Sequence, residues 1–330
     1  MLDQYNALER PAASSSSSGV SVYAVKQLRE GIFLARSSED CPAFVFASPA
    51  GASRPTRPLR LQHLSVSFCS ECRLERAGKA AILPGATVVE CAAASAGLAE
   101  YFLDTVGSCV QRMSGAVSEE EIANMLDVLA ELFRVMAQPA RREAAGLWAE
   151  LFLITSSADP VRMVRAWHMS AGDKFDFADG TDRLEVKASM RETRCHHFAY
   201  DQAHPPAGCI GYVASIIIRR SAAGMSVADL WKTARGQMGT AVDLLKVDTQ
   251  CLLALGAGWE QARQERFDSE FARGTLRIFA VEDIPRVPLC VVPGVSDIHF
   301  VTDLTFSVPL QRSNTSPLLG LLPQFGFGPI

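Results

Sequence analysis

The stretch from Lys174 to Ala188 constrains the fold of this chain more than any other part of the sequence. Asp179 and Gly180 form a strong turn signal between two short runs in which apolar and polar residues alternate. This pattern predicts two antiparallel strands joined by a tight turn, over Lys174–Phe177 and Arg183–Ser189. Because successive side chains of a strand point to opposite faces, each strand then has one apolar face and one polar face.

The polar face of this predicted hairpin collects three ionisable residues. Glu185 and Lys187 share one face of the second strand, and Asp176 lies on the polar side of the first. If the apolar faces coincide, the three side chains converge on one side of the sheet. Two carboxylates there can hold a hard divalent cation, and a nearby ammonium can orient water and stabilise developing charge. The alternative is a solvent-facing strand with an ordinary Glu–Lys pair.

A helix predicted from Gln138 to Thr155 offers a further acidic residue. Its apolar stripe is formed by Leu147, Trp148, Leu151, Phe152 and Ile154. Glu150 lies beside this stripe, and a carboxylate near a core-facing surface is costly unless it is paired or bound to a metal. Glu150 is therefore a candidate third ligand. The alternative is a residue at the edge of the stripe that reaches water or Arg141 and Arg142.

The order of predicted elements favours an α/β (α+β) domain whose mixed central sheet is flanked by helices. After the helix and the hairpin come further predicted elements, which are a strand over Ile210–Ile218, a helix over Ser226–Met238 and a strand over Thr275–Val281. Another strand is predicted before the hairpin, over Met163–Trp167. The core of this domain spans about 138–240.

The whole chain is predicted to divide into two regions, and the core lies in the second. Residues 1–91 form a β-rich N-terminal region, with short runs such as Ala43–Ala47 and Leu59–Phe68. Residues 92–330 comprise a helical linker, the core domain, a C-terminal strand and an irregular tail from Ser313. The linker contains a helix over Leu98–Met113 and a capping box at Ser118–Glu121 that opens a second helix.

Composition narrows the setting without naming a partner. The chain has no apolar run long enough for a transmembrane helix, and its nine cysteines are odd in number and scattered. These features, with an N-terminus that lacks a secretory signal, predict a cytoplasmic protein and no membrane partner. The pair Cys69 and Cys72 lacks the second pair that a structural zinc site needs.

The distribution of charge is more informative than its sum. The formal net charge is −4, yet residues 139–240 hold 13 Lys/Arg against 11 Asp/Glu. A locally cationic rim around acidic ligands suits a phosphodiester substrate. A solvated surface of mixed charge is the competing interpretation of the same counts.

Several short motifs occur in a set order along the chain. They are Gly146-Leu-Trp-Ala-Glu150, Ala166-Trp-His168, Asp176-Phe177, Glu185-Val-Lys187, His196-His197, Asp201-Gln202 and Gly294-Val-Ser-Asp297. In this order the chain resembles the bacterial PD-(D/E)XK motif proteins, often encoded beside restriction-modification and phage-defence genes. The resemblance implies a restriction-endonuclease-like core. One departure is that no proline precedes Asp176, where the chain has Phe175.

The resemblance implies a role for each residue of the motifs. Asp176 and Glu185, with the carbonyl of Val186, would bind one or two Mg²⁺ ions (Mn²⁺ being a substitute), and Glu150 would join the metal shell. Lys187 would activate or position the attacking water. Substrate contacts are expected from a polar set further along, namely Arg191, Arg194, His196, His197 and Gln202. For the two histidines a structural role at a strand end is an equal alternative, and His168 is expected to be structural.

The resulting hypothesis is a Mg²⁺-dependent DNA endonuclease that defends a bacterium against foreign DNA. Its expected partners are DNA and other defence-system proteins, and a homodimer is compatible with the sequence. The alternative is a catalytically idle nuclease fold that acts as a DNA-binding or assembly subunit. The sequence leaves open the target site, methylation dependence, DNA against RNA, and the number of metal ions.

Overall fold

A computed structural model describes residues 1–11, 21–47, 58–76, 79–92, 95–113, 118–168, 173–287 and 304–313. The chain forms two compact units, Met1–Gln138 and Pro139–Ile330. Within the described ranges, no helix combines the length and the apolar character that spanning a bilayer would need.

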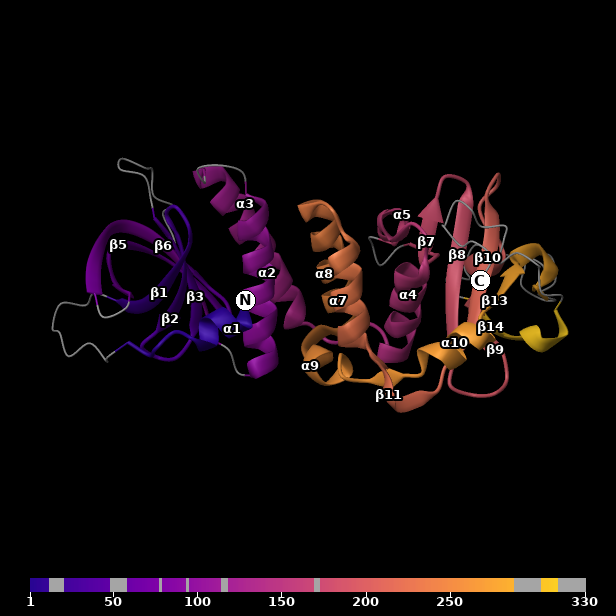
Figure 1. Cartoon of the computed structure of the whole chain (residues 1–330). Helices are drawn as coiled ribbons and strands as arrows, with labels where there is room; N and C mark the ends of the chain where they lie inside the picture. The colour runs from indigo at the N-terminus through magenta and orange to yellow at the C-terminus, as the bar shows by residue number, and fades with distance from the viewer. Residues whose placement is uncertain are drawn as a thin grey trace. The chain divides into compact units, whose positions relative to one another are not determined.

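The first unit is built on a closed sheet of short strands. Its strands are β1 (Val22–Arg29), β2 (Ile32–Ser37), β3 (Pro42–Ala47), β4 (Leu59–Arg60), β5 (Leu64–Arg76) and β6 (Lys79–Cys91). They run in the order β1-β2-β3-β6-β5-β4, and β1 also pairs in parallel with β5, so the sheet closes on itself (Figure 1). Alternate side chains fill its interior, among them Tyr23, Val45, Leu74 and Val88. The predicted strand over Leu59–Phe68 is in fact two strands, β4 and the start of β5, separated by a bend at 62–63.

Three helices lie in the described part of this first unit. They are α1 (Leu2–Asn6), α2 (Ala96–Arg112) and α3 (Glu119–Met136). The predicted capping box is present, because the Ser118 side chain accepts from the Glu121 N–H while Glu121 accepts from the Ser118 N–H. Phe102 of α2 meets Phe44 of β3 edge to face at 5.7 Å. This packing places the predicted helical linker with the N-terminal strands, and the boundary lies after Gln138 rather than at residue 91.

The second unit contains a mixed four-stranded sheet, as predicted. Its strands are β7 (Phe177–Asp179), β8 (Asp182–Ser189), β10 (Ile210–Ile217) and β13 (Arg277–Ala280), in the order β13-β10-β8-β7. β8 and β10 pair in parallel, and the two outer pairings are antiparallel. The hairpin turn is confirmed: Asp179 faces Asp182, and Gly180 has a φ of 54°, a left-handed conformation that glycine adopts without strain.

Helices and two small ribbons surround this sheet. The helices are α4 (Ala144–Ser156), α5 (Pro160–Ala166), α6 (Tyr200–Ala203), α7 (Val227–Gln237), α8 (Ala241–Leu255), α9 (Trp259–Ala262) and α10 (Ser269–Thr275). The ribbons pair β9 (Cys195–Ala199) with β14 (Thr305–Pro309), and β11 (Arg220–Ser226) with β12 (Arg266–Phe267). α4 packs between β8 and α7, which buries nearly all of its residues (Figure 1).

Three local predictions were wrong. The first strand of the hairpin runs over Phe177–Asp179 and not over Lys174–Phe177, because residues 174–176 form a bend, so Asp176 lies before the strand. Met163–Trp167 is the end of helix α5 and not a strand, because Asp159 caps the helix by accepting from the Arg162 N–H at 2.9 Å and Pro160 starts it. Helix α4 begins at Ala144 and not at Gln138. The backbone N–H groups of Arg141 and Arg142 donate to the Ala254 carbonyl, so this segment runs irregularly along the end of α8.

Two features of the sequence fall outside the described ranges. These are the motif Gly294–Asp297 and the tail beyond Ser313 that was predicted to be irregular. The site described below lies wholly within the described part of the second unit.

Candidate metal and catalytic centre

The hairpin holds the first two acidic residues of the predicted site. Asp176 precedes β7, and its Oδ2 accepts from the Val186 N–H at 2.8 Å. Val186 lies between Glu185 and Lys187 on β8, so this bond fixes the Asp176 carboxylate at the middle of that tripeptide. Both carboxylates are buried, with Asp176 6% exposed and Glu185 4% exposed. Asp176 therefore lies beside the Glu185–Lys187 segment, held there by a backbone hydrogen bond from just before β7.

A glutamine completes the setting of Lys187. The Lys187 Nζ lies 2.7 Å from Glu185 Oε1 and donates to Gln202 Oε1 at 3.1 Å. Gln202 Nε2 in turn donates to Glu185 Oε1 at 2.7 Å. Its own amide is fixed at the start of α6, where the Ala199 N–H donates to Gln202 Oε1 at 3.0 Å. The Lys187 ammonium is thus positioned from two sides beside the acidic residues.

Glu150 reaches the same place from helix α4. It is 3% exposed, and the Trp167 Nε1–H donates to its Oε2 at 2.6 Å. Arg142 pairs with Glu150 Oε1 and lies 3.1 Å from Asp176 Oδ1. Glu150 and Asp176 therefore share one guanidinium group. Both interpretations of Glu150 hold together, because it joins the acidic cluster and it also binds an arginine.

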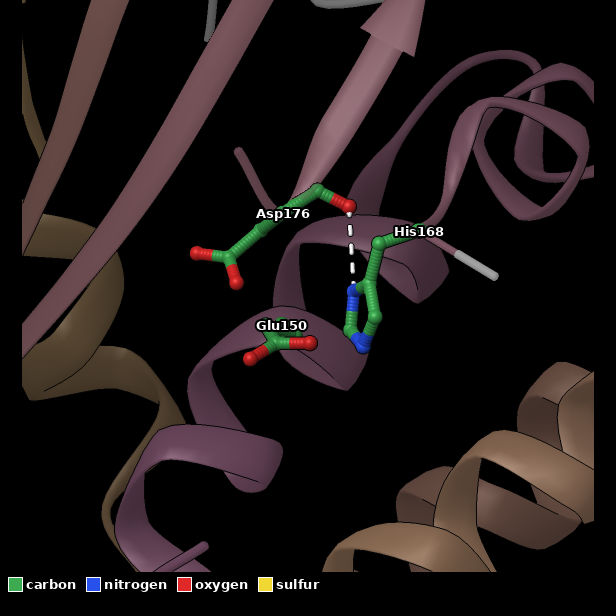
Figure 2. A group of neighbouring side chains, drawn as sticks. All are labelled: Glu150, His168 and Asp176. Atoms are coloured by element: carbon green, nitrogen blue, oxygen red, sulfur yellow. Dashed lines mark hydrogen bonds between the residues drawn. The ribbon is translucent and has the colours of Figure 1, made fainter. Parts of the chain in front are cut away.

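His168 completes a three-residue cluster with Glu150 and Asp176. One ligand atom of each residue lies within 4.8 Å of the others, and Figure 2 shows the ring beside the Glu150 carboxylate. The His168 backbone N–H donates to the Asp176 carbonyl at 2.8 Å, and its Nδ1 lies 3.3 Å from the same oxygen. If Nδ1 carries the proton, Nε2 is left with a lone pair for a metal ion. The expectation that His168 is merely structural does not account for this placement.

The electrostatics of the centre are unbalanced. Burial, with repulsion from Asp176, raises the pKa of Glu150 and of Glu185 to about 8. Burial lowers the pKa of His168, and the neighbouring Arg142 adds to this effect. Among the described residues, Arg142 and Lys187 are the cations that pair with the three carboxylates. The Glu185 Oε2 is buried and has no hydrogen-bond partner among the described residues.

These residues fit a divalent metal ion. An unsatisfied buried carboxylate oxygen is costly, and an added cation would remove that cost. Carboxylate oxygens are the ligands preferred by Mg²⁺ and Mn²⁺, and Mn²⁺ also accepts an imidazole nitrogen. A cavity of about 220 Å³ opens onto Glu150 and His168 and gives an ion a route inward. The centre can therefore hold a hard cation beside a positioned ammonium group.

The other predicted substrate-binding residues lie apart from this cluster. His196 is buried, with its Nε2 2.7 Å from Ser215 Oγ, and burial lowers its pKa to about 4. Arg194 donates to the Ser215 carbonyl at 2.8 Å and to the Thr275 carbonyl, so it ties β9 to neighbouring elements.

The remaining two candidates are exposed, and no contact joins them to the acidic cluster. His197 Nδ1 lies 2.9 Å from Ser307 Oγ of β14. Arg191 lies in the bend between β8 and β9. Of the predicted substrate residues, only Gln202 contacts the cluster, and substrate contacts for Arg191 and His197 stay predictions.

Sequence reasoning missed three contributors to the centre. Trp167 and His168 occur in a motif that the sequence displays, but a strand was predicted there and gave them no direction toward Glu150. Arg142 was considered only as an alternative partner of Glu150. The signal for it was its place just before the helix that carries Glu150.

The α+β fold and the Asp176, Glu185 and Lys187 constellation define a nuclease-like class of protein. A family model described as "Putative PD-(D/E)XK family member, (DUF4420)" matches residues 1–305. The chain therefore belongs to this family, and the resemblance seen in the sequence is confirmed. No curated protein and no solved structure matches the chain.

Proposed function

We propose that the protein is a metal-dependent DNA endonuclease that hydrolyses phosphodiester bonds. The observation that carries the proposal is the buried Glu185 Oε2, which has no hydrogen-bond partner among the described residues and lies in a cluster of three carboxylates beside the Lys187 ammonium. A bound cation would give this oxygen a partner.

Each residue of the centre then has a role. Asp176, Glu185 and Glu150 would hold Mg²⁺ or Mn²⁺, with the Val186 carbonyl and His168 as further ligands. When bound, the ion supplies charge stabilisation at the phosphate and a more acidic water. Lys187 places a positive charge next to the nucleophile, and Gln202 keeps that ammonium in position. Trp167 orients Glu150 through its indole N–H.

A wide cleft next to the centre suits a phosphodiester strand. Its volume is about 730 Å³, and Trp167 and His168 form the side nearest the acidic cluster. Four basic residues line it, namely Arg165, Lys174, Arg183 and Lys246, with the acidic Asp173 and Asp201. A cationic lining next to metal ligands would draw a phosphate backbone toward them. The choice of DNA, like the defence role, follows from the family resemblance.

One observation favours a second candidate function, the catalytically idle DNA-binding or assembly subunit. The Arg142 guanidinium already bridges Glu150 and Asp176, so part of the acidic charge is neutralised by the chain itself. A scaffold could keep this arrangement without any metal. The two candidates differ in whether Lys187 matters for activity.

Cleavage assays separate the two candidates. Supercoiled plasmid and phage DNA are incubated with the wild type in Mg²⁺, Mn²⁺ or EDTA, and with Lys187→Ala. The matched control is Lys232→Ala, which removes an exposed lysine of α7. We expect nicking or linearisation only with metal, normal activity for the control, and a loss of about 10²–10³ in rate for Lys187→Ala. Equal cleavage by Lys187→Ala and wild type, with both folded, would leave the binding-subunit function.

The defence role has a cellular test. Bacteria that carry the gene with its neighbours should restrict phage plating, and Lys187→Ala should abolish that restriction while the protein accumulates normally. Protection that survives the substitution would separate defence from phosphodiester hydrolysis.

A further inference from the structure

The first unit carries a groove that the proposed chemistry does not use. Its volume is about 680 Å³. Fourteen residues line it, and the charged ones are Glu9, Arg10, Lys26, Arg73, Glu75, Arg76 and Lys79. Basic side chains thus outnumber acidic ones there by five to two.

The groove follows the outer face of the seam that closes the barrel. β1 and β5 pair in parallel from Val22 with Arg73 to Ala24 with Glu75. Tyr23 and Leu74 alternate with these residues and fill the interior, so Lys26 and Arg73 lie on the outside. The segment from Ala7 to Pro11 lines the groove as well. It is tied to the barrel by Arg10, whose Nε and Nη2 donate to the Ser38 carbonyl at 2.9 and 2.7 Å.

Most of the positive charge in the groove is not neutralised. Arg73 lies 3.5 Å from Glu75, and these two charges offset each other. Arg76 donates to the neutral Gln27 amide oxygen at 3.3 Å. Within the described ranges, Lys26 and Lys79 have no ion-pair partner, and both are exposed. Residues 1–138 hold 12 Lys/Arg against 15 Asp/Glu, so a cationic groove stands on a unit with an acidic sum of −3.

We propose that this groove binds the phosphate backbone of a nucleic acid. Exposed cations without partners gather phosphates and gain from the release of counterions. The cations that are not offset, Arg10, Lys26, Arg76 and Lys79, come from separate places along the groove, which suits a repeating polyanion better than one phosphate. Backbone contacts of this kind position a protein without reading sequence. The groove is separate in the chain from the acidic centre, and an idle subunit would use it equally.

The test measures binding of the full-length chain to a short fluorescein-labelled DNA duplex in EDTA, so that cleavage is silent. Lys26→Glu/Arg76→Glu is compared with Arg60→Glu/Arg134→Glu, which places the same charge change on other exposed positions of the first unit. We expect the groove variant to bind the duplex at least about 10-fold more weakly than wild type. The slope of its log affinity against log salt concentration should fall in magnitude by about two, while the control variant changes little.

Further arms identify the ligand and keep the result independent of cleavage. A labelled single strand is measured in parallel, and unlabelled duplex, inorganic phosphate and poly-glutamate serve as competitors. Competition by duplex alone supports a nucleic-acid backbone, whereas displacement by poly-glutamate at equal charge would overturn it in favour of an acidic peptide. Wild-type affinity and slope in Lys26→Glu/Arg76→Glu would also overturn it. The neutral pair Lys26→Gln/Arg76→Gln serves if the reversal unfolds the chain. Cleavage is measured in the separate plasmid assay of wild type and Lys187→Ala with Mg²⁺, so failure of the nuclease proposal is scored separately.

Discussion

Two of the buried carboxylate networks in the described part of the second unit differ in how their charge is balanced. Asp248 of α8 is 3% exposed, and each of its oxygens has a partner. The Trp231 Nε1–H donates to Oδ1 at 2.7 Å, and Arg235 binds Oδ2 at 2.5 Å. In the acidic centre, Glu185 is equally buried, but its Oε2 has no partner among the described residues.

The comparison teaches what distinguishes a structural ion pair from a cation site. Both networks use an indole N–H on a buried carboxylate, Trp231 on Asp248 and Trp167 on Glu150. The Asp248 network matches one carboxylate with one guanidinium. The centre sets three carboxylates against Arg142 and Lys187. Chemical type and burial are alike, so the missing positive charge is the functional signal.

The largest expected effect is on the balanced network. Asp248→Ala should lower the free energy of unfolding by about 3–5 kcal/mol, because it removes the buried carboxylate that both Arg235 and the Trp231 indole N–H bind. Urea denaturation followed by circular dichroism measures this loss. Asp176→Ala is the comparison, since it relieves repulsion in metal-free buffer as well as removing a partner of Arg142. An equal loss for both variants would contradict the distinction drawn here.

Cleavage should show the reverse order. Asp176→Asn removes a proposed metal ligand and should reduce the cleavage rate by about 10²–10³, or 3–4 kcal/mol in the barrier. Asp248→Asn should leave the rate per folded molecule unchanged. The measurement is plasmid cleavage at saturating Mn²⁺, with folded protein quantified by its thermal transition. A strong loss of cleavage in Asp248→Asn and none in Asp176→Asn would contradict this assignment and place Asp248, not Asp176, in the catalytic site.

Metal binding should stabilise only the unbalanced network. Mn²⁺ at 100 times its dissociation constant should raise the free energy of unfolding by about 2.7 kcal/mol. Glu185→Gln should lose most of this gain, whereas Asp248→Asn should keep it. Thermal unfolding with and without Mn²⁺ gives the comparison, and Ca²⁺ tests the response to a larger ion. A gain that persists in Glu185→Gln would move the metal away from that residue.

In EDTA, the free energy of unfolding should also depend on pH through the buried Glu185. The folded pKa of Glu185, about 8, lies above its unfolded value near ~4.3, so the folded state holds the proton more tightly. This contribution is present at low pH and is lost as the pH rises through 8. Glu185→Gln has no such proton. Its stability relative to wild type should therefore rise from pH 5 to pH 9. A constant difference across this range would contradict the prediction.

The smallest effect concerns the cation that the chain itself supplies. Arg142→Met should lower metal-free stability and bind Mn²⁺ more tightly by a modest factor, because the guanidinium no longer competes for Glu150 and Asp176. Titration calorimetry measures the affinity. Arg141→Met is the matched control, since Arg141 is exposed in the same segment. Weaker metal binding in Arg142→Met would instead make Arg142 a support of the site.

Period-2 patterning was enough to predict the hairpin turn and strand β8, but not the bend at 174–176 that carries Asp176. Asp176, Glu185 and Lys187 still emerged from local sequence, and Glu150 emerged from its place beside an apolar stripe. His168 and Arg142 could not be found in this way, because α5 and the segment before α4 bring them in by tertiary packing. For His196, the structure favours the structural alternative that the sequence had left open. Its side chain is buried where it contacts Ser215 of β10, and the residues next to it in the sequence do not predict that contact.

The two-residue turn at Gly180 and Thr181 also implies an order of events as the chain folds. The bond from the Val186 N–H to Asp176 closes a loop of only ten residues, whereas the parallel pairing of β8 with β10 joins Glu185 to Val213. Short loops close at a lower entropic cost, so the hairpin should form before the sheet is complete. Asp176 and Glu185 would then come together while their carboxylates are still hydrated. A divalent cation present at that stage should bind both carboxylates and increase the rate of folding. The refolding rate with and without the cation would then report on metal binding at the centre.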